Sequence, residues 1–240
     1  MSARLVLLRH GQSVSNSRNR FTGWSDVDLT DQGRAEARAA ARLLEDAELE
    51  FDVAFTSCLR RAIHTLWLVM EGMDRMWVPV YRCWRLNERH YGRLQGLEKR
   101  ATVKRHGVAQ VRSWRGSFST PPPPVDPDDE RHPRNDPSYA SLDPALLPAS
   151  ESLQDTLERV AKCWREAVVP ELRAGRTVLI AAHCNSLRSL VKLIDGIDNE
   201  KIVDFDIPTA LPLVYELDDD LAPRSRRFLG SPAVAGLTRA

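Results

Sequence analysis

The chain opens with a short apolar run, LVLL at residues 5–8, that leads directly into Arg9, His10 and Gly11. A wholly apolar run of this length is typical of a buried strand in a parallel sheet. In open α/β sheets, ligands bind in the crevice beyond the carboxyl ends of the strands. The motif therefore predicts Arg9 and His10 at the mouth of a pocket, beside a backbone that Gly11 keeps compact.

Arg9 and His10 together favour an anionic ligand. A guanidinium next to an imidazole disfavours the protonated ring, so His10 suits the role of a neutral nucleophile better than that of a base with a raised pKa. Arginine binds phosphate through two parallel hydrogen bonds, and we interpret the anion as a phosphate group. The alternative at this point is an Arg-His pair in an ordinary surface loop.

Two later apolar runs repeat this pattern. Residues 51–56 predict a second buried strand, followed by Arg60 and Arg61 in the opening turn of a helix. Residues 177–182 predict another buried strand, which ends at His183. Strands and helices alternate along the chain, so we predict an α/β fold: a three-layer α/β/α sandwich with a mostly parallel central sheet.

Caps and periodicity predict the remaining elements. They are a helix after the N-cap Thr30, a strand at 78–81, a helix from Lys99 to about Trp114-Arg115, a helix behind a Ser152–Asp155 capping box, a helix capped by Asn185 or Ser186 and stopped by Gly196, and a strand at 211–217. The arginine-rich tail from Ala222 onward, and residues 230–240 above all, is expected to be frayed.

Length and charge suit one globular domain covering residues 1–240. Lys+Arg number 34 and Asp+Glu 33, which gives a net charge of +1 and argues against general binding of nucleic acid or membrane surfaces. The four cysteines show no metal or redox spacing, the first residues do not resemble a secretory signal, and no apolar run reaches the roughly 20 residues of a membrane helix. We expect a cytoplasmic protein.

The segment at about 116–150 differs in composition from the rest of the chain. It contains four consecutive prolines at 121–124, followed by an acidic stretch. It is either a disordered linker or an insertion that packs over the active site as a lid, because long loops inside domains are usually functional or disordered. Apolar anchors favour the lid: Phe118, Tyr139, Leu142, Leu146 and Leu147.

These residues combine into a phosphoryl-transfer site. His10 would attack a phosphoryl group, while Arg9, Arg61 and His183 would spread the charge on its oxygens. Glu88, in a loop dense with titratable groups, would protonate the leaving oxygen. The chain has neither a GxxxxGK[ST] loop nor carboxylates with metal-ligand spacing, so a phosphohistidine route without a metal is the better fit.

The chain resembles the histidine phosphatase superfamily in its RHG signature at residues 9–11 and, within it, the cofactor-dependent phosphoglycerate mutases. The likeness covers about residues 5–229. The RHG motif alone is weak evidence for the family, whereas WRLNERHYG at 84–92 together with the proline segment is highly specific to the mutase branch. Further motifs that carry the resemblance are FTGW at 21–24, TS at 56–57 with RRA at 60–62, LQGL at 94–97, DERHP at 129–133 and IAAH at 180–183.

The resemblance implies an isomerase of glycolysis and gluconeogenesis that interconverts 3-phosphoglycerate and 2-phosphoglycerate. His10 would be phosphorylated by the primer 2,3-bisphosphoglycerate, pass the group to 3-phosphoglycerate and reclaim one from the bisphosphate, with no metal. Glu88 would donate and accept the proton, and Arg9, Arg61 and His183 would hold the transferred group. The implied substrate contacts are Ser13, Asn16, Thr22, Gly23, Arg89, Tyr91, Lys99, Arg115, Cys184 and Asn185. A homodimer is the expected assembly.

Three positions depart from the family's pattern. The family usually has tryptophan at the place of Ser15, a second arginine at Gly116, and glycine at Cys184. Loss of a hydrogen bond to a charged group costs roughly 1.5–3 kcal/mol, so Gly116 predicts about ten- to a hundredfold weaker substrate binding, which Arg112 could partly offset. The cationic surroundings of Cys184 predict an oxidisable thiol that bound bisphosphoglycerate protects.

Two alternatives stay open beside the mutase. A bisphosphoglycerate phosphatase or synthase, or a broader histidine phosphatase, would share the chemistry of His10 and Glu88. A pseudoenzyme that only binds ligands belongs to another class, and the three departures motivate it. The presence of all five expected catalytic residues argues against the pseudoenzyme.

Overall fold

A single six-stranded sheet forms the centre of the structure, a computed structural model that describes residues 3–230. Its strand order is β3-β2-β4-β1-β5-β6. The four strands from β3 to β1 are parallel, and β5 and β6 are antiparallel to their neighbours. The strands are β1 (Ala3–Arg9), β2 (Val53–Thr56), β3 (Val80–Arg82), β4 (Val178–Ala182), β5 (Leu213–Leu217) and β6 (Pro223–Phe228).

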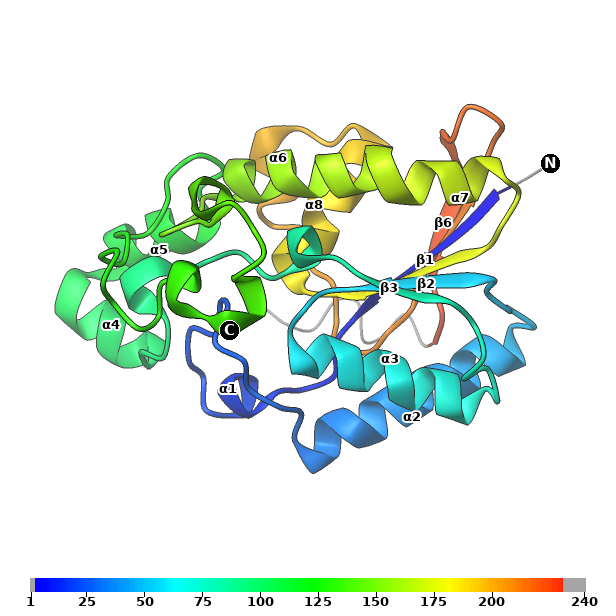
Figure 1. The fold of residues 1–240 in the computed structure, drawn as a ribbon, viewed down its shortest axis with the longest axis horizontal. Coiled ribbons are helices and arrows are strands. Elements are labelled where there is room, and N and C mark those ends of the chain that lie inside the picture. The colour runs from blue at the N-terminus through cyan, green and yellow to red at the C-terminus, as the bar shows by residue number, and fades with distance from the viewer. Residues whose placement is uncertain (1–2, 231–240) are drawn as a thin grey trace.

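Helices cover both faces of this sheet, which confirms the predicted three-layer α/β/α sandwich (Figure 1). Helices α2 and α3 lie on one face, α6, α7 and α8 lie on the other, and α4 and α5 lie beyond one end of the sheet. The helices are α1 (Val14–Ser17), α2 (Asp31–Asp46), α3 (Arg60–Gly72), α4 (Lys99–His106), α5 (Val108–Gly116), α6 (Leu153–Cys163), α7 (Val169–Arg173), α8 (Cys184–Asp195) and α9 (Asn199–Ile202). A π-helical turn, η6 (Trp164–Val168), joins α6 to α7.

Alternate side chains of the buried strands enter two cores, because successive residues of a strand point to opposite faces. Leu5 and Leu7 of β1 pack on the side of α6 and α8. Val6 and Leu8 pack on the side of α2 and α3. All four side chains are fully buried, so this run is apolar because both faces of the strand are covered.

The structure corrects three predicted elements. The helix expected from Lys99 to about Trp114-Arg115 is two helices, because Gly107, at φ 82°, separates α4 from α5. His183, and neither Asn185 nor Ser186, is the N-cap of α8. Ser186 still contributes to this cap as the partner whose hydroxyl accepts from the His183 backbone N–H.

The third correction concerns the tail, which was expected to be frayed from Ala222 onward. Its first part, Pro223–Phe228, forms β6, an edge strand that pairs with β5. The strand is polar and exposed along most of its length, so it lacks the apolar alternation that marks a half-buried strand. The part of the prediction that falls on residues 231–240 lies outside the described residues.

The segment at 116–150 packs against the rest of the chain. It contains the short helices η3 (Pro133–Asn135), η4 (Pro137–Tyr139) and η5 (Pro144–Leu146). Tyr139 and Leu147 are buried against Trp24 and Trp84, and the Asn87 amide donates to the Tyr139 hydroxyl at 2.8 Å. Of the expected apolar anchors, Leu146 is exposed. Across residues 3–230, no helix combines the length and apolar character that crossing a bilayer requires.

Candidate active site

Two neighbouring parallel strands bring the histidines together. Strand β1 ends at Arg9 and β4 ends at Ala182, and these two residues are paired in the sheet. The residues that follow, His10 and His183, are therefore adjacent, with ring centroids 5.1 Å apart. The His10 backbone N–H also donates to the Ala182 carbonyl at 3.0 Å, which extends the ladder into the site.

His10 is held as a neutral ring with its lone pair on Nε2. Burial, then Arg61 and Arg9, lower the pKa of His10 well below its ordinary value of 6.5. His10 Nδ1 lies 2.7 Å from the carbonyl oxygen of Gly11, which can only accept, so Nδ1 carries the proton. The lone pair is therefore on Nε2, towards which Arg61 Nε donates at 3.3 Å.

The loop behind His10 leaves no room for a larger residue at Gly11. A Cβ atom at this position would lie 2.2 Å from the carbonyl oxygen of Gly33 in α2. The Gly11 N–H donates to Thr65 Oγ1 on α3 at 3.1 Å. The sequence feature RHG thus ends in a residue that lets the loop close onto two helices and hold the imidazole in place.

Arg61 is a buried cation aimed at His10 from the first turn of α3. Its guanidinium donates to the carbonyls of Ser25 at 2.9 Å and Gly23 at 2.8 Å. Burial lowers the pKa of Arg61 to about 10, so it stays charged at neutral pH. Its neighbour Arg60 is exposed and pairs with Asp26 at 3.0 Å, as expected for adjacent helix residues that face different ways.

His183 is fully buried beside His10. Burial, then Arg61 and His10, lower its pKa well below 6.5. Its Nε2 atom lies 2.8 Å from the Ser57 hydroxyl, which itself accepts from the Leu59 backbone N–H at 3.1 Å. When the Ser57 hydroxyl donates to Nε2, the ring proton of His183 is on Nδ1, a buried atom without a partner among the described residues.

Glu88 brings a carboxylate to the same place from the segment after η1 (Trp84–Leu86). Its Oε1 atom accepts from the Asn185 backbone N–H at 3.1 Å and from the Asn185 side chain at 3.0 Å. It also accepts from the Arg89 backbone N–H at 2.9 Å. Helix α8 therefore contributes a histidine as its cap and, two residues later, the donor that orients Glu88.

These groups open into a cavity of about 920 Å³ that is rich in cations. Burial lowers the pKa of Lys99, and the neighbouring cation of Arg115 lowers it further. Twelve of the predicted residues line it: Arg9, His10, Asn16, Thr22, Gly23, Arg61, Glu88, Tyr91, Lys99, Arg115, Cys184 and Asn185.

The other predicted residues lie behind the cavity wall. Ser13 caps α1, and its hydroxyl and Asn16 Oδ1 form a capping box. Arg89 is buried under Tyr91, with its guanidinium 4.7 Å from the ring centre, and donates to the Arg115 carbonyl at 2.9 Å. His183 does not line the cavity; its ring packs against the His10 ring and is hydrogen-bonded to the Ser57 hydroxyl.

Sequence reasoning overlooked several parts of the site. Arg188 lines the cavity one helical turn after Cys184, and its guanidinium donates to the Cys184 thiol at 3.7 Å. Residues from α9 and the segment after it also line the cavity, at Asn199, Glu200, Val203 and Asp204. Arg188 Nε also donates to the Phe205 carbonyl at 2.9 Å, in the segment after α9, and a contact to a distant backbone carbonyl has no sequence signature.

The positions that depart from the family's pattern lie at the cavity. Gly116 and Cys184 line it, and Ser15 is buried in α1 next to it. No atom lies within 4 Å of the place where a Cβ at Gly116 would stand, so the missing side chain leaves open space. Among residues 3–230, no group of three or more His, Cys, Asp or Glu side chains is arranged to hold a metal ion.

The arrangement defines the class of protein: the chain belongs to the histidine phosphatase superfamily, branch 1, whose family model matches residues 5–223. Two curated relatives show which members of this superfamily the chain is similar to. Both are named 2,3-bisphosphoglycerate-dependent phosphoglycerate mutase, and both are 58% identical over 233 residues, which is 97% of this chain and 93% of each relative. They come from the Hildenborough and DP4 strains of Nitratidesulfovibrio vulgaris.

Solved structures with lower sequence identity share the fold. "Mycobacterial hydrolase 1" is 24% identical with a TM-score of 0.70, over 95% of this chain and 97% of its own. A mycobacterial glucosyl-3-phosphoglycerate phosphatase is 24% identical with a TM-score of 0.67, over 94% of this chain and 96% of its own. At this identity the likeness concerns the fold alone.

Proposed function

We propose that this chain is a 2,3-bisphosphoglycerate-dependent phosphoglycerate mutase, an isomerase that interconverts 3-phosphoglycerate and 2-phosphoglycerate. The observation that carries the proposal is the 58% identity to curated mutases over nearly the full length. The geometry supports it, because one cavity combines a neutral His10, a buried Arg61 and the carboxylate of Glu88. These groups suit transfer of a phosphoryl group to and from a histidine.

His10 acts as the nucleophile through Nε2. As Nε2 attacks phosphorus, an N–P bond forms and the P–O bond to the sugar acid breaks. Arg61 lies next to Nε2 and stabilises the charge on the phosphoryl oxygens, together with Arg9 and His183. Arg9 lines the cavity beside His10, and His183 lies directly behind the His10 ring, with ring centroids 5.1 Å apart.

Glu88 moves the proton that this exchange requires. It protonates the oxygen that leaves when His10 takes a phosphoryl group. When phosphorylated His10 gives its group to the 2-hydroxyl of 3-phosphoglycerate, Glu88 accepts the hydroxyl proton. His10 then reclaims the other phosphoryl group, Glu88 returns the proton to the 3-oxygen, and 2-phosphoglycerate remains. The two donors from Asn185 hold Glu88 for both transfers.

The cavity suits the primer, a sugar acid with three anionic groups: one carboxylate and two phosphates. Arg9 and Arg61 lie at its inner end beside His10, and Lys99 and Arg115 lie on the helices α4 and α5 farther along the wall. Two separate groups of cations suit a ligand with anionic groups at both ends. When bound, 2,3-bisphosphoglycerate supplies the phosphoryl group that makes His10 competent, and no residue in this scheme needs a metal.

The segment at 116–150 supports a role as a lid. Residues 116–119 line the cavity, and the rest of the segment is anchored on Trp24 and Trp84, beside the site. We propose that it excludes water while the phosphoryl group is on the histidine. Water would otherwise compete as acceptor, and a phosphatase is the second candidate function because the open space at Gly116 weakens the hold on the sugar acid.

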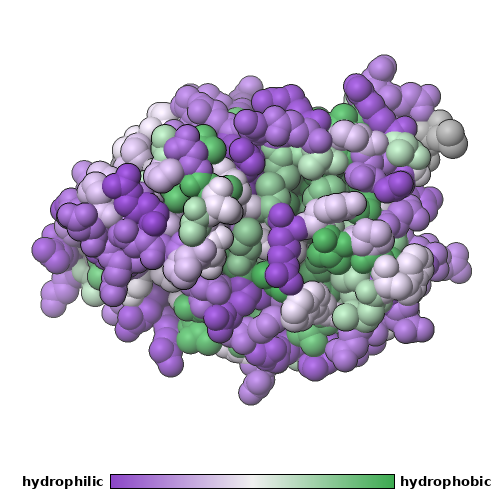
Figure 2. Space-filling model, viewed as in Figure 1, coloured by the Kyte–Doolittle hydropathy of each residue, from purple (hydrophilic) through white to green (hydrophobic). Residues whose placement is uncertain are grey.

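We further propose that the protein acts in the cytoplasm as a homodimer that pairs through the edge strand β3. This face exposes Trp67, Trp77 and Tyr81, together with Met76. Figure 2, viewed as in Figure 1, shows apolar residues gathered around β3, between α6 and α3. An exposed edge strand with aromatic side chains is a surface that monomers seldom leave uncovered.

A coupled assay for conversion of 3-phosphoglycerate to 2-phosphoglycerate, with and without 2,3-bisphosphoglycerate, tests the function. We expect turnover that the bisphosphate stimulates and that His10→Ala abolishes. Release of inorganic phosphate as the main product would favour the phosphatase. A folded protein with neither activity would support the pseudoenzyme.

A further inference from the structure

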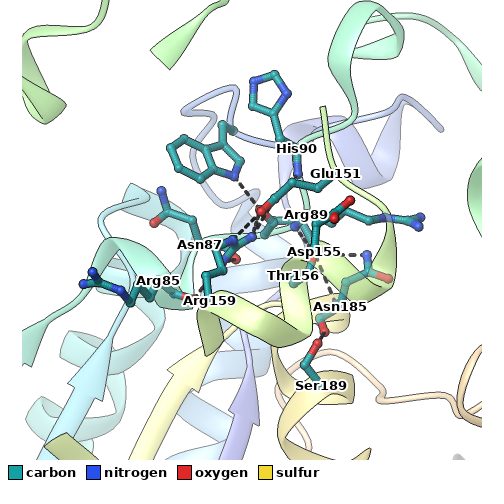
Figure 3. Close-up of polar contacts among 12 residues, drawn as sticks. Arg85, Asn87, Arg89, His90, Glu151, Asp155, Thr156, Arg159, Asn185 and Ser189 are labelled. Atoms are coloured by element: carbon teal, nitrogen blue, oxygen red, sulfur yellow. Dashed lines mark hydrogen bonds and ion pairs between the residues drawn. The ribbon is translucent and has the colours of Figure 1, made fainter. Parts of the chain in front are cut away.

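The loop that carries Glu88 is held by a side chain that lies outside the cavity, Arg159 on α6. Its guanidinium donates to the carbonyls of Arg85 at 2.6 Å, Asn87 at 2.9 Å and Glu88 at 2.9 Å. Only 8% of the Arg159 side chain is exposed. One planar group thus gathers three carbonyls of a four-residue stretch (Figure 3).

Glu151 completes this clamp. Its carboxylate accepts from Arg159 Nε at 2.5 Å and Nη2 at 2.8 Å, and only 3% of its side chain is exposed. The same carboxylate accepts from the His90 backbone N–H at 2.8 Å, while the Glu151 N–H donates to the His90 carbonyl at 2.9 Å. The ion pair therefore holds the chain on both sides of Glu88 (Figure 3).

A third contact fixes the carbonyl of Glu88 itself. Trp24 Nε1 donates to that oxygen at 2.6 Å, and the Arg159 guanidinium lies 5.7 Å from the Trp24 ring centre. The carboxylate end of Glu88 is held separately, by the two donors of Asn185 on α8. Helix α6 thus sets the backbone of Glu88, and the neighbouring α8 sets its side chain.

The energetics of a buried ion pair point to a role beyond stability. Removing two charges from water costs several kcal/mol per ion, and apolar replacements of such pairs are often neutral or stabilising. Arg159 and Glu151 also do not line the active-site cavity, so they do not bind substrate directly. What the pair supplies that apolar residues cannot is a fixed place for the backbone carbonyls around Glu88.

We propose that Arg159, held by Glu151, is a positioning residue that sets the carboxylate of Glu88 for proton transfer. The inference rests on the proposed function, in which Glu88 exchanges a proton with the sugar-acid oxygen. A planar guanidinium with five donors can serve three carbonyls and both carboxylate oxygens at once. A lysine ammonium has three donors at one point and cannot span them.

A double-substitution cycle in the full-length protein tests the proposal. We expect Arg159→Lys to lower kcat for 3-phosphoglycerate at least tenfold and to change KM less than threefold, because the cavity wall is untouched. In a Glu88→Gln background, where the carboxylate is gone, Arg159→Lys should lower the remaining rate of radiolabel transfer less than twofold. Equal losses in both backgrounds would show a general structural effect and overturn the proposal.

Two further variants separate positioning from loss of stability. Val160→Ala, on the same helix and in the same core cluster as Leu86, weakens α6 packing but leaves every hydrogen-bonding group of Arg159 and Glu151 in place, so its kcat should stay within twofold of wild type. If Arg159→Lys does not fold, Glu151→Gln carries the same test, since it keeps the shape and removes the charge that holds Arg159. An unchanged kcat in Glu151→Gln would overturn the clamp.

Failure of the proposed function is recognised from the wild type alone, which would then not convert 3-phosphoglycerate. The clamp can still be tested on hydrolysis of simple phosphate monoesters. A positioned acid matters for an alkyl leaving group and little for p-nitrophenolate. Arg159→Lys should therefore slow alkyl ester hydrolysis at least fivefold more than p-nitrophenyl phosphate hydrolysis, and equal losses would refute the positioning role.

Discussion

Gly116→Arg should tighten substrate binding. Gly116 is the last residue of α5 and lines the cavity, and no atom lies within 4 Å of the place where its Cβ would stand. The new guanidinium can therefore reach the cavity without displacing a neighbour. A hydrogen bond to a charged group contributes about 1.5–3 kcal/mol, which corresponds to a KM for 3-phosphoglycerate about ten- to a hundredfold lower.

The same substitution should change folding little. Arginine has a better helix propensity than glycine by up to about 0.8 kcal/mol, and a cation at the C-terminal end of a helix adds about 0.3–1 kcal/mol. Repulsion from Arg112, one turn earlier, removes a few tenths of a kcal/mol. The free energy of unfolding should thus rise by about 1.5 kcal/mol at most, which a urea titration would measure.

Steady-state kinetics in the coupled assay, with Gly116→Gln as the matched control, would test whether the added charge lowers the KM for 3-phosphoglycerate. Glutamine adds a side chain with helix propensity and hydrogen-bonding capacity but no charge, so its KM should stay within about threefold of wild type. A KM for Gly116→Arg equal to that of Gly116→Gln would refute the reasoning that a missing cation weakens this site.

Two further predictions concern acid stability and the thiol at the site. Burial lowers the pKa of His90 to about 3 and also lowers the pKa values of His10 and His183, so the unfolded state binds more protons in acid and the free energy of unfolding falls as pH drops below about 6.5. His90 alone should cost about 2 kcal/mol at pH 5, and equal urea midpoints at pH 5 and pH 8 would contradict this. Iodoacetamide should inactivate the wild type by alkylating Cys184, 2,3-bisphosphoglycerate should protect it, and Cys184→Gly should resist it. Alkylation at the rate of a free thiol, with or without the ligand, would show that the site does not activate Cys184.

The buried part of the fold could be predicted because each central strand is covered on both faces. The runs that end at Arg9 and Ala182 are apolar for this reason. Because these two strands are parallel neighbours, the residues that follow them meet at the carboxyl ends of the strands. The edge strand β6 could not be predicted, because Pro223–Phe228 is held by backbone pairing to β5 and its side chains face solvent. The break at Gly107 depends on one residue's backbone angle, which helical periodicity does not reveal.

The candidate site was predictable where a motif places a titratable side chain directly after a buried strand, as at His10 and His183, or in a loop dense with such groups, as at Glu88. His10, Arg61 and Glu88 lie together as expected. The residues that hold them are harder to predict, because their partners are backbone carbonyls that have no sequence signature. In the sequence, Arg159 is one polar position of an amphipathic helix, and its contacts with residues 85–88 are visible only in the structure.

The central claim is that His10 carries the phosphoryl group between sugar acids. The most direct measurement is to incubate the protein with radiolabelled 2,3-bisphosphoglycerate, isolate it, and chase it with unlabelled 3-phosphoglycerate. We predict an acid-labile, base-stable label on the wild type that moves into phosphoglycerates during the chase, and no label on His10→Ala. A label that persists in His10→Ala, or turnover by the wild type without any labelled protein, would contradict the account.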